Sequence, residues 1–303
     1  MHRLMIGGVA GLTCLAFLVS TASAKAMMIA PAPIPERVAQ AEVIVIGTVG
    51  KVEPQNVSAI PFPGAKDKVE YQVVALKIDD ALMGAKAGSE IRVGFIPPQN
   101  PTPAGPGVIR TPLRRPGVIL TTGQEACFFL TKHPEENFYV APAYFDIMEK
   151  KVDGFDKDMA LVKRCVKLLS DPDASLKSKE AEDRLLTAGM LVSRYRTAKP
   201  GSTGKTEAID AEQSKRILEI LADADWNVQA APRPGPVGFQ MTAQTIFFRL
   251  GLIPEDGWVQ PQNFMQVPAA AKAWLKEHAG TYRIKRFVVE KSDKDKSDKE
   301  KKD

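Results

Sequence analysis

Cysteine and histidine are scarce in this sequence, whose 303 residues hold three of each. Beyond the first 24 residues the only cysteines are Cys127 and Cys165. In an exported protein two cysteines can form a disulfide, but a chain of this size does not need one bridge to be stable. Both states, a bridge between Cys127 and Cys165 and two separate thiols, stay open at this point.

The two histidines beyond residue 24, His133 and His278, show no metal-ligand spacing with the cysteines or carboxylates. We therefore expect no metal and no cofactor. No G-x-S-x-G pattern occurs, so the signature of a nucleophile elbow is missing. A Ser-His-Asp arrangement assembled from distant residues is not excluded by counting. The simpler interpretation gives both histidines structural roles, His133 in a turn and His278 at a helix end.

Charge of one sign is not in large excess, since 41 basic residues face 36 acidic ones. The charges are mixed along the chain, without the basic patch that is typical of nucleic-acid-binding proteins. No apolar stretch after the N-terminus is long enough to span a bilayer. We expect neither nucleic-acid binding nor a transmembrane helix in the processed chain.

The long apolar run that is present lies at the N-terminus. Arg3 precedes it, and Ala22, Ser23 and Ala24 form a small-x-small cleavage site. This pattern predicts a signal peptide over residues 1–24 and an exported protein, periplasmic or secreted. The alternatives are an uncleaved anchor and a lipoprotein processed at Cys14, whose preceding residues fit a lipobox poorly.

The C-terminal residues 291–303, KSDKDKSDKEKKD, contain almost only Lys, Asp and Ser. Such a segment cannot bury apolar surface, so we expect a disordered charged tail. Contact with an anionic surface is the alternative, although the acids cancel most of the lysine charge.

Between residues 36 and 150 the apolar pattern is that of β-strands. The second strand changes phase at Val73 and Val74, which predicts a bulge or bend. Pro142 predicts an edge or bulge in the last strand. Five strands without crossover helices favour a small β-barrel; the predicted strands are residues 43–52, 69–82, 91–95, 127–130 and 138–148.

The segment PPQNPTPAGPGVIRTPLRRPG, residues 97–117, contains too many prolines for regular structure. Arg110, Arg114 and Arg115 lie among them. Proline-rich segments present a preformed extended backbone to partners, so these arginines are the candidate binding residues. The alternative is a surface loop without a partner.

After residue 154 the apolar period changes from two to about three and a half, which predicts helices. The connections are rich in Gly, Pro, Asp and Ser. We expect a helical second domain over residues 154–280 and one late strand within 282–289. The predicted helices cover residues 155–169, 181–195, 217–224, 242–250 and 268–278, and residues 36–40 form one turn ahead of the first strand.

The stretch VIVIGTVGKVE, residues 43–53, resembles the start of a dinucleotide-binding unit. The G-x-G-x-x-G fingerprint needs three glycines and a following helix. Val49 occupies the position of the middle glycine, and Pro54 ends the strand where a helix should begin. We predict a barrel strand in which glycine permits a tight bend.

Two further patterns are incomplete. GSTGKT at residues 201–206 lacks the first glycine and the preceding strand of a P-loop, so we predict an interhelical loop in which Thr203 or Thr206 caps the next helix. The acids in VDGFDKD, residues 152–158, lack the ligand order of a calcium loop. Acids ahead of a helix are favoured by capping and by the helix dipole.

The order of the strand segments resembles a known family. AEVIVIGTV, VEYQVVALKIDDALMG, EIRV, GQEACFFL and FYV follow one another as in the netrin-like and tissue-inhibitor-of-metalloproteinase type of OB-fold found in exported bacterial proteins. The resemblance covers residues 36–150 and implies a five-stranded OB barrel. It does not imply inhibitor activity, because the N-terminal cysteine that reaches the protease metal is replaced here by Lys25-Ala26.

Together these patterns predict an α+β protein with an N-terminal five-stranded OB-like β-barrel and a mainly α-helical C-terminal domain. With export and no assembled catalytic signature, we expect a non-enzymatic binding or interaction protein of the cell envelope. Its partner would be another envelope protein or a glycan. The alternative is a hydrolase whose site is assembled at the interface of the two domains.

Overall fold

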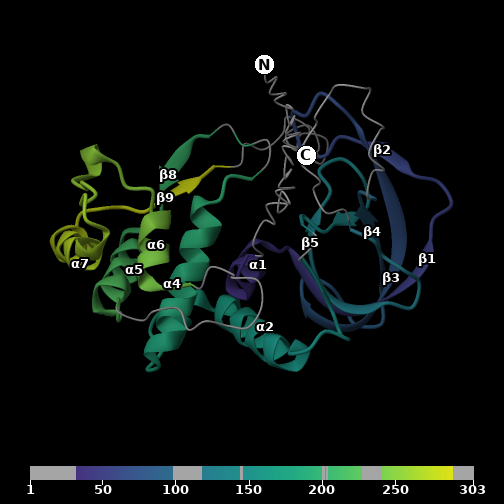
Figure 1. Cartoon of the computed structure of the whole chain (residues 1–303), viewed down its shortest axis with the longest axis horizontal. Helices are drawn as coiled ribbons and strands as arrows, with labels where there is room; N and C mark the ends of the chain where they lie inside the picture. The colour runs from purple at the N-terminus through teal and green to yellow at the C-terminus, as the bar shows by residue number, and fades with distance from the viewer. Residues whose placement is uncertain are drawn as a thin grey trace, which may run out of the picture.

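The computed structural model describes residues 32–97, 118–143, 146–199, 202, 204–226 and 241–288. It is a mixed α+β structure, as the sequence predicts. The large sheet forms one side of the molecule and helices α4 to α7 the other, with α1 and α2 between them (Figure 1). The predicted signal peptide, Cys14, the three loop arginines and the predicted charged tail lie outside the described residues.

The predicted strands lie close to their expected places, apart from the fifth. Each strand of the large sheet pairs with neighbours through backbone hydrogen bonds, and β2 is an additional short strand between the first two predicted ones. The strands are β1 Val43–Val52, β2 Val57–Ala59, β3 Val69–Met83, β4 Glu90–Phe95, β5 Glu125–Lys132, β6 Tyr139–Val140 and β7 Ile147–Glu149.

The pairings form a ring. β1 pairs with β3, β3 with β4, β4 with β6, β6 with β5, and β5 again with β1. All of these pairs are antiparallel except β4 with β6, which is parallel. β2 adds to β3, and β7 adds to β5.

The change of phase at Val73 and Val74 in the sequence corresponds to apolar packing on both faces of β3. Val73 and Val74 are both fully buried although they are adjacent in a strand. Val73 packs with Tyr71 and Phe138, whereas Val74 packs in the separate cluster that contains Phe128. Adjacent side chains of a strand point to opposite faces, so β3 has apolar contacts on both of its faces here.

The prediction of one continuous strand over 138–148 is wrong. Two short strands, β6 and β7, occupy this region, and Ala141, Pro142, Ala143 and Asp146, which lie between them, belong to no strand. Pro142 has no N–H for a ladder, and Asp146 holds a turn instead: its side chain accepts from the Ala143 N–H at 2.8 Å. Pro142, Ala143 and Asp146 form one wall of the candidate site.

The helices follow the predicted period. Helix α1 is preceded by Pro33 and carries Pro35 in its first turn, where a missing N–H costs nothing. Helix α5 is capped by Asp210, which accepts from the Gln213 N–H, so the expected threonine cap is wrong for Thr206. The helices are α1 Ile34–Gln40, α2 Phe155–Ser170, α3 Pro172–Ser175, α4 Ala181–Arg196, α5 Ala211–Asp223, α6 Ala243–Arg249 and α7 Val267–His278.

A second, two-stranded sheet joins β8 Thr206–Ala208 to β9 Lys285–Phe287. The predicted late strand is therefore confirmed. Thr206, which ends the GSTGKT pattern, is the first residue of β8. A phosphate-binding loop follows a strand and opens a helix, and this segment leads into a strand instead.

Apolar packing joins the two halves of the chain. One buried cluster combines residues of α1, β1, β5, α2 and α4, among them Val38, Ile44, Phe129, Val162 and Met190. A second cluster fills the space between the strands, and a third, rich in tryptophan, lies among α4 to α7. Helix α1 precedes the strands in sequence, yet it packs on α2 and α4.

Cys127 and Cys165 are free thiols in the structure. Both are fully buried within the cluster that contains α1. Burial raises the pKa of each thiol to about 12, because a thiolate would be poorly solvated there. These side chains act as small apolar groups of the core.

Candidate functional site

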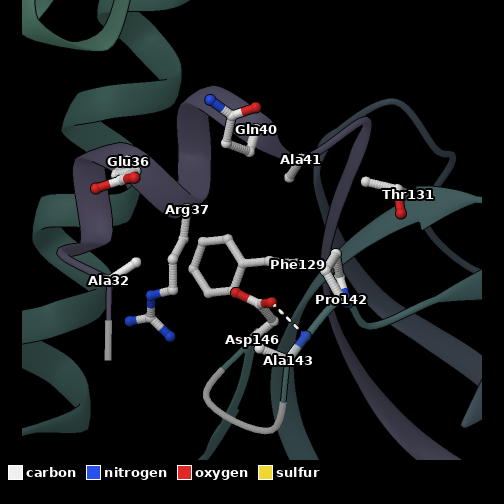
Figure 2. Close-up of a pocket in the computed structure, with 10 residues that line it drawn as sticks. All are labelled: Ala32, Glu36, Arg37, Gln40, Ala41, Phe129, Thr131, Pro142, Ala143 and Asp146. Carbon is white, nitrogen blue, oxygen red and sulfur yellow. Dashed lines mark hydrogen bonds between the residues drawn. The ribbon is translucent and has the colours of Figure 1, made fainter. Parts of the chain in front are cut away.

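A pocket of about 180 Å³ lies where α1 meets β5 and the residues Pro142, Ala143 and Asp146. Ala32, Ala41, Phe129, Pro142 and Ala143 give it a mainly apolar lining. Glu36, Arg37, Gln40, Thr131 and Asp146 supply its polar groups. Figure 2 shows the side chains of Arg37, Phe129 and Asp146 pointing toward one another, whereas those of Glu36 and Gln40 point away from them.

Helix α1 is fixed in place by polar contacts with the helical half. The side-chain amide of Gln40 donates to the carbonyl oxygen of Ser193 at 2.9 Å. Arg194 donates to the carbonyl oxygen of Ala39 at 3.1 Å. Glu36 accepts from Arg249 and forms an ion pair with it. Two polar side chains of the pocket, Glu36 and Gln40, are thus engaged in holding the helix.

Arg37 is 9% exposed, which is unusual for arginine. Its guanidinium lies over the Phe129 ring, 4.7 Å from the centroid, and one of its nitrogens donates to the Met148 sulfur at 3.1 Å. Burial lowers the pKa of Arg37, while the nearby charge of Asp146 opposes this change. An aromatic ring attracts a cation that lies over its face, so Arg37 has a favourable contact that does not involve water.

Asp146 is the second buried charged residue of the pocket, 7% exposed. One carboxylate oxygen accepts from the Ala143 N–H, as the dashed line in Figure 2 shows. Burial raises the pKa of Asp146 to about 6, although the charge of Arg37 and the hydrogen bond from Ala143 lower it. Desolvation therefore outweighs both stabilising contacts, and this carboxyl group gains and loses its proton close to neutral pH.

The two histidines lie in other parts of the chain. His133 is 2% exposed, and its Nδ1 accepts from the N–H groups of Glu135 and Glu136. Its Nε2 donates to the carbonyl oxygen of Ile60 at 3.0 Å. Both ring nitrogens are thus engaged with the backbone, and the turn after β5 is bonded to the segment after β2.

His278 lies in the last turn of α7, as predicted. Its ring stacks on Trp274 with a centroid distance of 4.7 Å, and its Nδ1 is 3.0 Å from the carbonyl oxygen of the same residue. Neither histidine lines the pocket, so the structure does not bring a histidine to the carboxyl group of Asp146.

The other expectations from the sequence concern the loop arginines, metal ions and membrane helices. Arg110, Arg114 and Arg115 lie outside these residues, so they remain a prediction. No group of three or more His, Cys, Asp or Glu in the described ranges could hold a metal ion. In that same part of the chain, no helix has the length and apolar character needed to cross a bilayer.

Arg37, Phe129 and Asp146 were not identified from the sequence. Arg37 was placed in a single helical turn, and Asp146 within a strand. The spacing of Pro142 and Asp146 carries a usable signal, because proline ends a ladder and aspartate four residues later can cap the resulting turn. The sequence carries no signal for the burial of Arg37, because that burial depends on β5 and α2 covering one side of α1.

Comparison with known proteins gives no family for the chain: a scan against family models and a search of curated proteins both return no match.

Proposed function

We propose that this protein is an exported, non-enzymatic binding protein of the cell envelope, and that the pocket lined by α1, β5, Pro142, Ala143 and Asp146 receives part of its partner. The observation that carries the proposal is the composition of the pocket. Its lining is mainly apolar, and Glu36, Gln40 and Asp146 already have hydrogen-bond partners within the protein. An apolar group can enter without breaking these bonds.

We further propose that the strands form an OB-like barrel. The ring of pairings, β1-β3-β4-β6-β5-β1, supports this, as does the strand order expected from the netrin-like resemblance. OB folds bind ligands on one face and in the loops after the first and fourth strands. In this chain the corresponding loops are residues 53–68 and 133–138.

Those loops lack the stacking surface that a glycan or an oligonucleotide needs. Tyr71 and Phe138, the aromatic rings next to them, are 4% and 2% exposed and pack against His133. Phe62, 45% exposed, is the exception. This favours the α1 pocket as the binding site and the apolar side chain of a protein partner as the occupant.

A hydrolase is the second candidate, and Asp146 is the observation that favours it. A carboxyl group with a pKa of about 6 is suited to general acid–base catalysis at neutral pH. The pocket also lies where the sheet meets the helices, as the hydrolase hypothesis requires. Among the described residues, its lining contains no serine, cysteine or histidine to act as nucleophile, so we prefer binding.

The test uses N-acetyl-leucinamide, a neutral mimic of a leucine side chain in a peptide. In protein with ¹³C-labelled alanine methyl groups, we expect this probe to shift the signals of Ala32 and Ala41, which line the pocket. Ala143→Leu fills the pocket and is expected to weaken the binding at least tenfold. The matched control Ala273→Leu, at an exposed position of α7, should bind like the natural chain.

Signals of Ala32 and Ala41 that do not move at millimolar probe, or that move equally in Ala143→Leu, would refute this site. Hydrolysis of ester or amide substrates that is lost in Asp146→Asn would support the hydrolase instead.

A further inference from the structure

Asp146 is both buried and part of the pocket wall. Its carboxylate has two stabilising contacts in the protein, the Ala143 N–H and the charge of Arg37. Asp146 is 7% exposed and lines the pocket, so water in the pocket can reach its carboxylate. An apolar ligand that fills the pocket removes that water and leaves both protein contacts in place.

Removing water from a carboxylate favours its protonated form. Burial already dominates the environment of Asp146, because it outweighs Arg37 and the hydrogen bond together. A further loss of water acts in the same direction. Ligand binding and proton uptake are then linked. If the ligand raises the affinity of Asp146 for a proton, a proton on Asp146 raises the affinity of the pocket for the ligand by the same factor.

Other charged or titratable groups face the pocket from α1, α2, α6 and β5. Arg37 faces Asp146 from α1, and its positive charge is also supported by Asp158 of α2. Glu36 of α1 is held by Arg249 of α6. Cys127 of β5, with a pKa of about 12, stays protonated. Burial raises the pKa of Asp146 to about 6, so its proton is exchanged near neutral pH.

We propose that the pocket binds an uncharged apolar side chain together with a proton on Asp146, so that the protein holds its partner more tightly in mildly acidic than in alkaline surroundings. This inference rests on the proposed binding function of the same pocket. The sign identifies the ligand class, because a cationic group would favour the ionised carboxylate and would bind more tightly at alkaline pH.

The experiment measures the dissociation constant of N-acetyl-leucinamide for the full chain between pH 5 and pH 8. This probe does not titrate in that range. We expect about tenfold tighter binding at pH 5, which corresponds to a rise of about one unit in the pKa of Asp146 on binding. Calorimetry at pH 6 in two buffers of different ionisation enthalpy should show proton uptake by the complex.

Asp146→Asn mimics the protonated carboxyl group. It is expected to bind the probe at pH 8 as tightly as the natural chain does at pH 5, with no change over the range. Asp67→Asn, which removes an exposed carboxylate, should keep the natural pH profile.

Two results would overturn the inference while leaving the binding site intact: shifts of the Ala32 and Ala41 signals with equal affinity at both pH values, or tighter binding at pH 8. If these signals do not shift at any pH, the proposed function fails as well.

Discussion

Asp146→Asn is expected to stabilise the folded protein at pH 8 by about 3 kcal/mol. The pKa of Asp146 is raised from 3.8 to about 6 in the folded state, mainly by burial. A difference of about two pKa units between the folded and unfolded chain corresponds to about 3 kcal/mol. The protonated carboxyl group and the asparagine amide both avoid the cost of a buried charge, so the variant keeps stability that the natural chain loses.

The sign of this pH dependence follows from the direction in which folding shifts the pKa of Asp146. A carboxyl group whose pKa is raised by folding binds its proton more tightly in the folded state. The contribution of Asp146 to the stability of the natural chain is therefore largest below pH 4. It is lost as the pH rises through about 6. Above pH 7 the loss is complete, and the difference between variant and natural chain reaches its maximum.

Urea unfolding at pH 5 and pH 8 checks this prediction. The free energy of unfolding of Asp146→Asn should exceed that of the natural chain by a larger margin at pH 8 than at pH 5. Asp67→Asn, the exposed control, should show no such difference. A margin that is equal at both pH values, or larger at pH 5, would mean that Asp146 is well solvated.

A carboxylate that costs stability and lines a pocket is typical of residues kept for binding or catalysis.

The α+β class and most elements were predictable because local patterns determine them. The helices after residue 154 follow a clear period of about three and a half, and α2, α4 and α7 lie where that period places them. The phase change at Val73 and Val74 predicted a bulge or bend, and the pairing of β1 with β3 shifts register beside it, between Val49 and Val52. In each of these cases the signal lies within about fifteen neighbouring residues.

The candidate site was not predictable, because it depends on contacts between residues far apart in the sequence. Arg37 and Asp146 are separated by more than a hundred positions, and neither has unusual neighbours in the sequence. Their burial depends on α1 packing against α2, α4 and β5. The break between β6 and β7 was indicated only by Pro142, and the sequence interpretation treated it as a bulge within one strand.

Gly47 decides between the two interpretations of VIVIGTVGKVE. A Cβ at this position would lie 2.5 Å from the Lys77 carbonyl oxygen and 3.2 Å from the Leu76 side chain, both on the neighbouring strand β3. The register between β1 and β3 also shifts next to it, between Ile46 and Gly47. The glycine therefore permits a close approach of two strands, where the sequence analysis expected a tight bend; no helix begins after it, as predicted.

We expect Gly47→Ala to destabilise the fold by about 3 kcal/mol, at the upper end for an overpacked core, because the obstacle is a backbone oxygen that cannot rotate away. Gly50→Ala in the same strand is the matched control. Its Cβ would lie 3.1 Å from the Ala75 carbonyl oxygen, so a shift of a few tenths of an ångström accommodates it. We expect a change within about 1 kcal/mol for this variant, since alanine loses less chain entropy than glycine. Urea unfolding at one pH measures both, and equal stabilities of the two variants would show that the strands separate at Gly47 without cost.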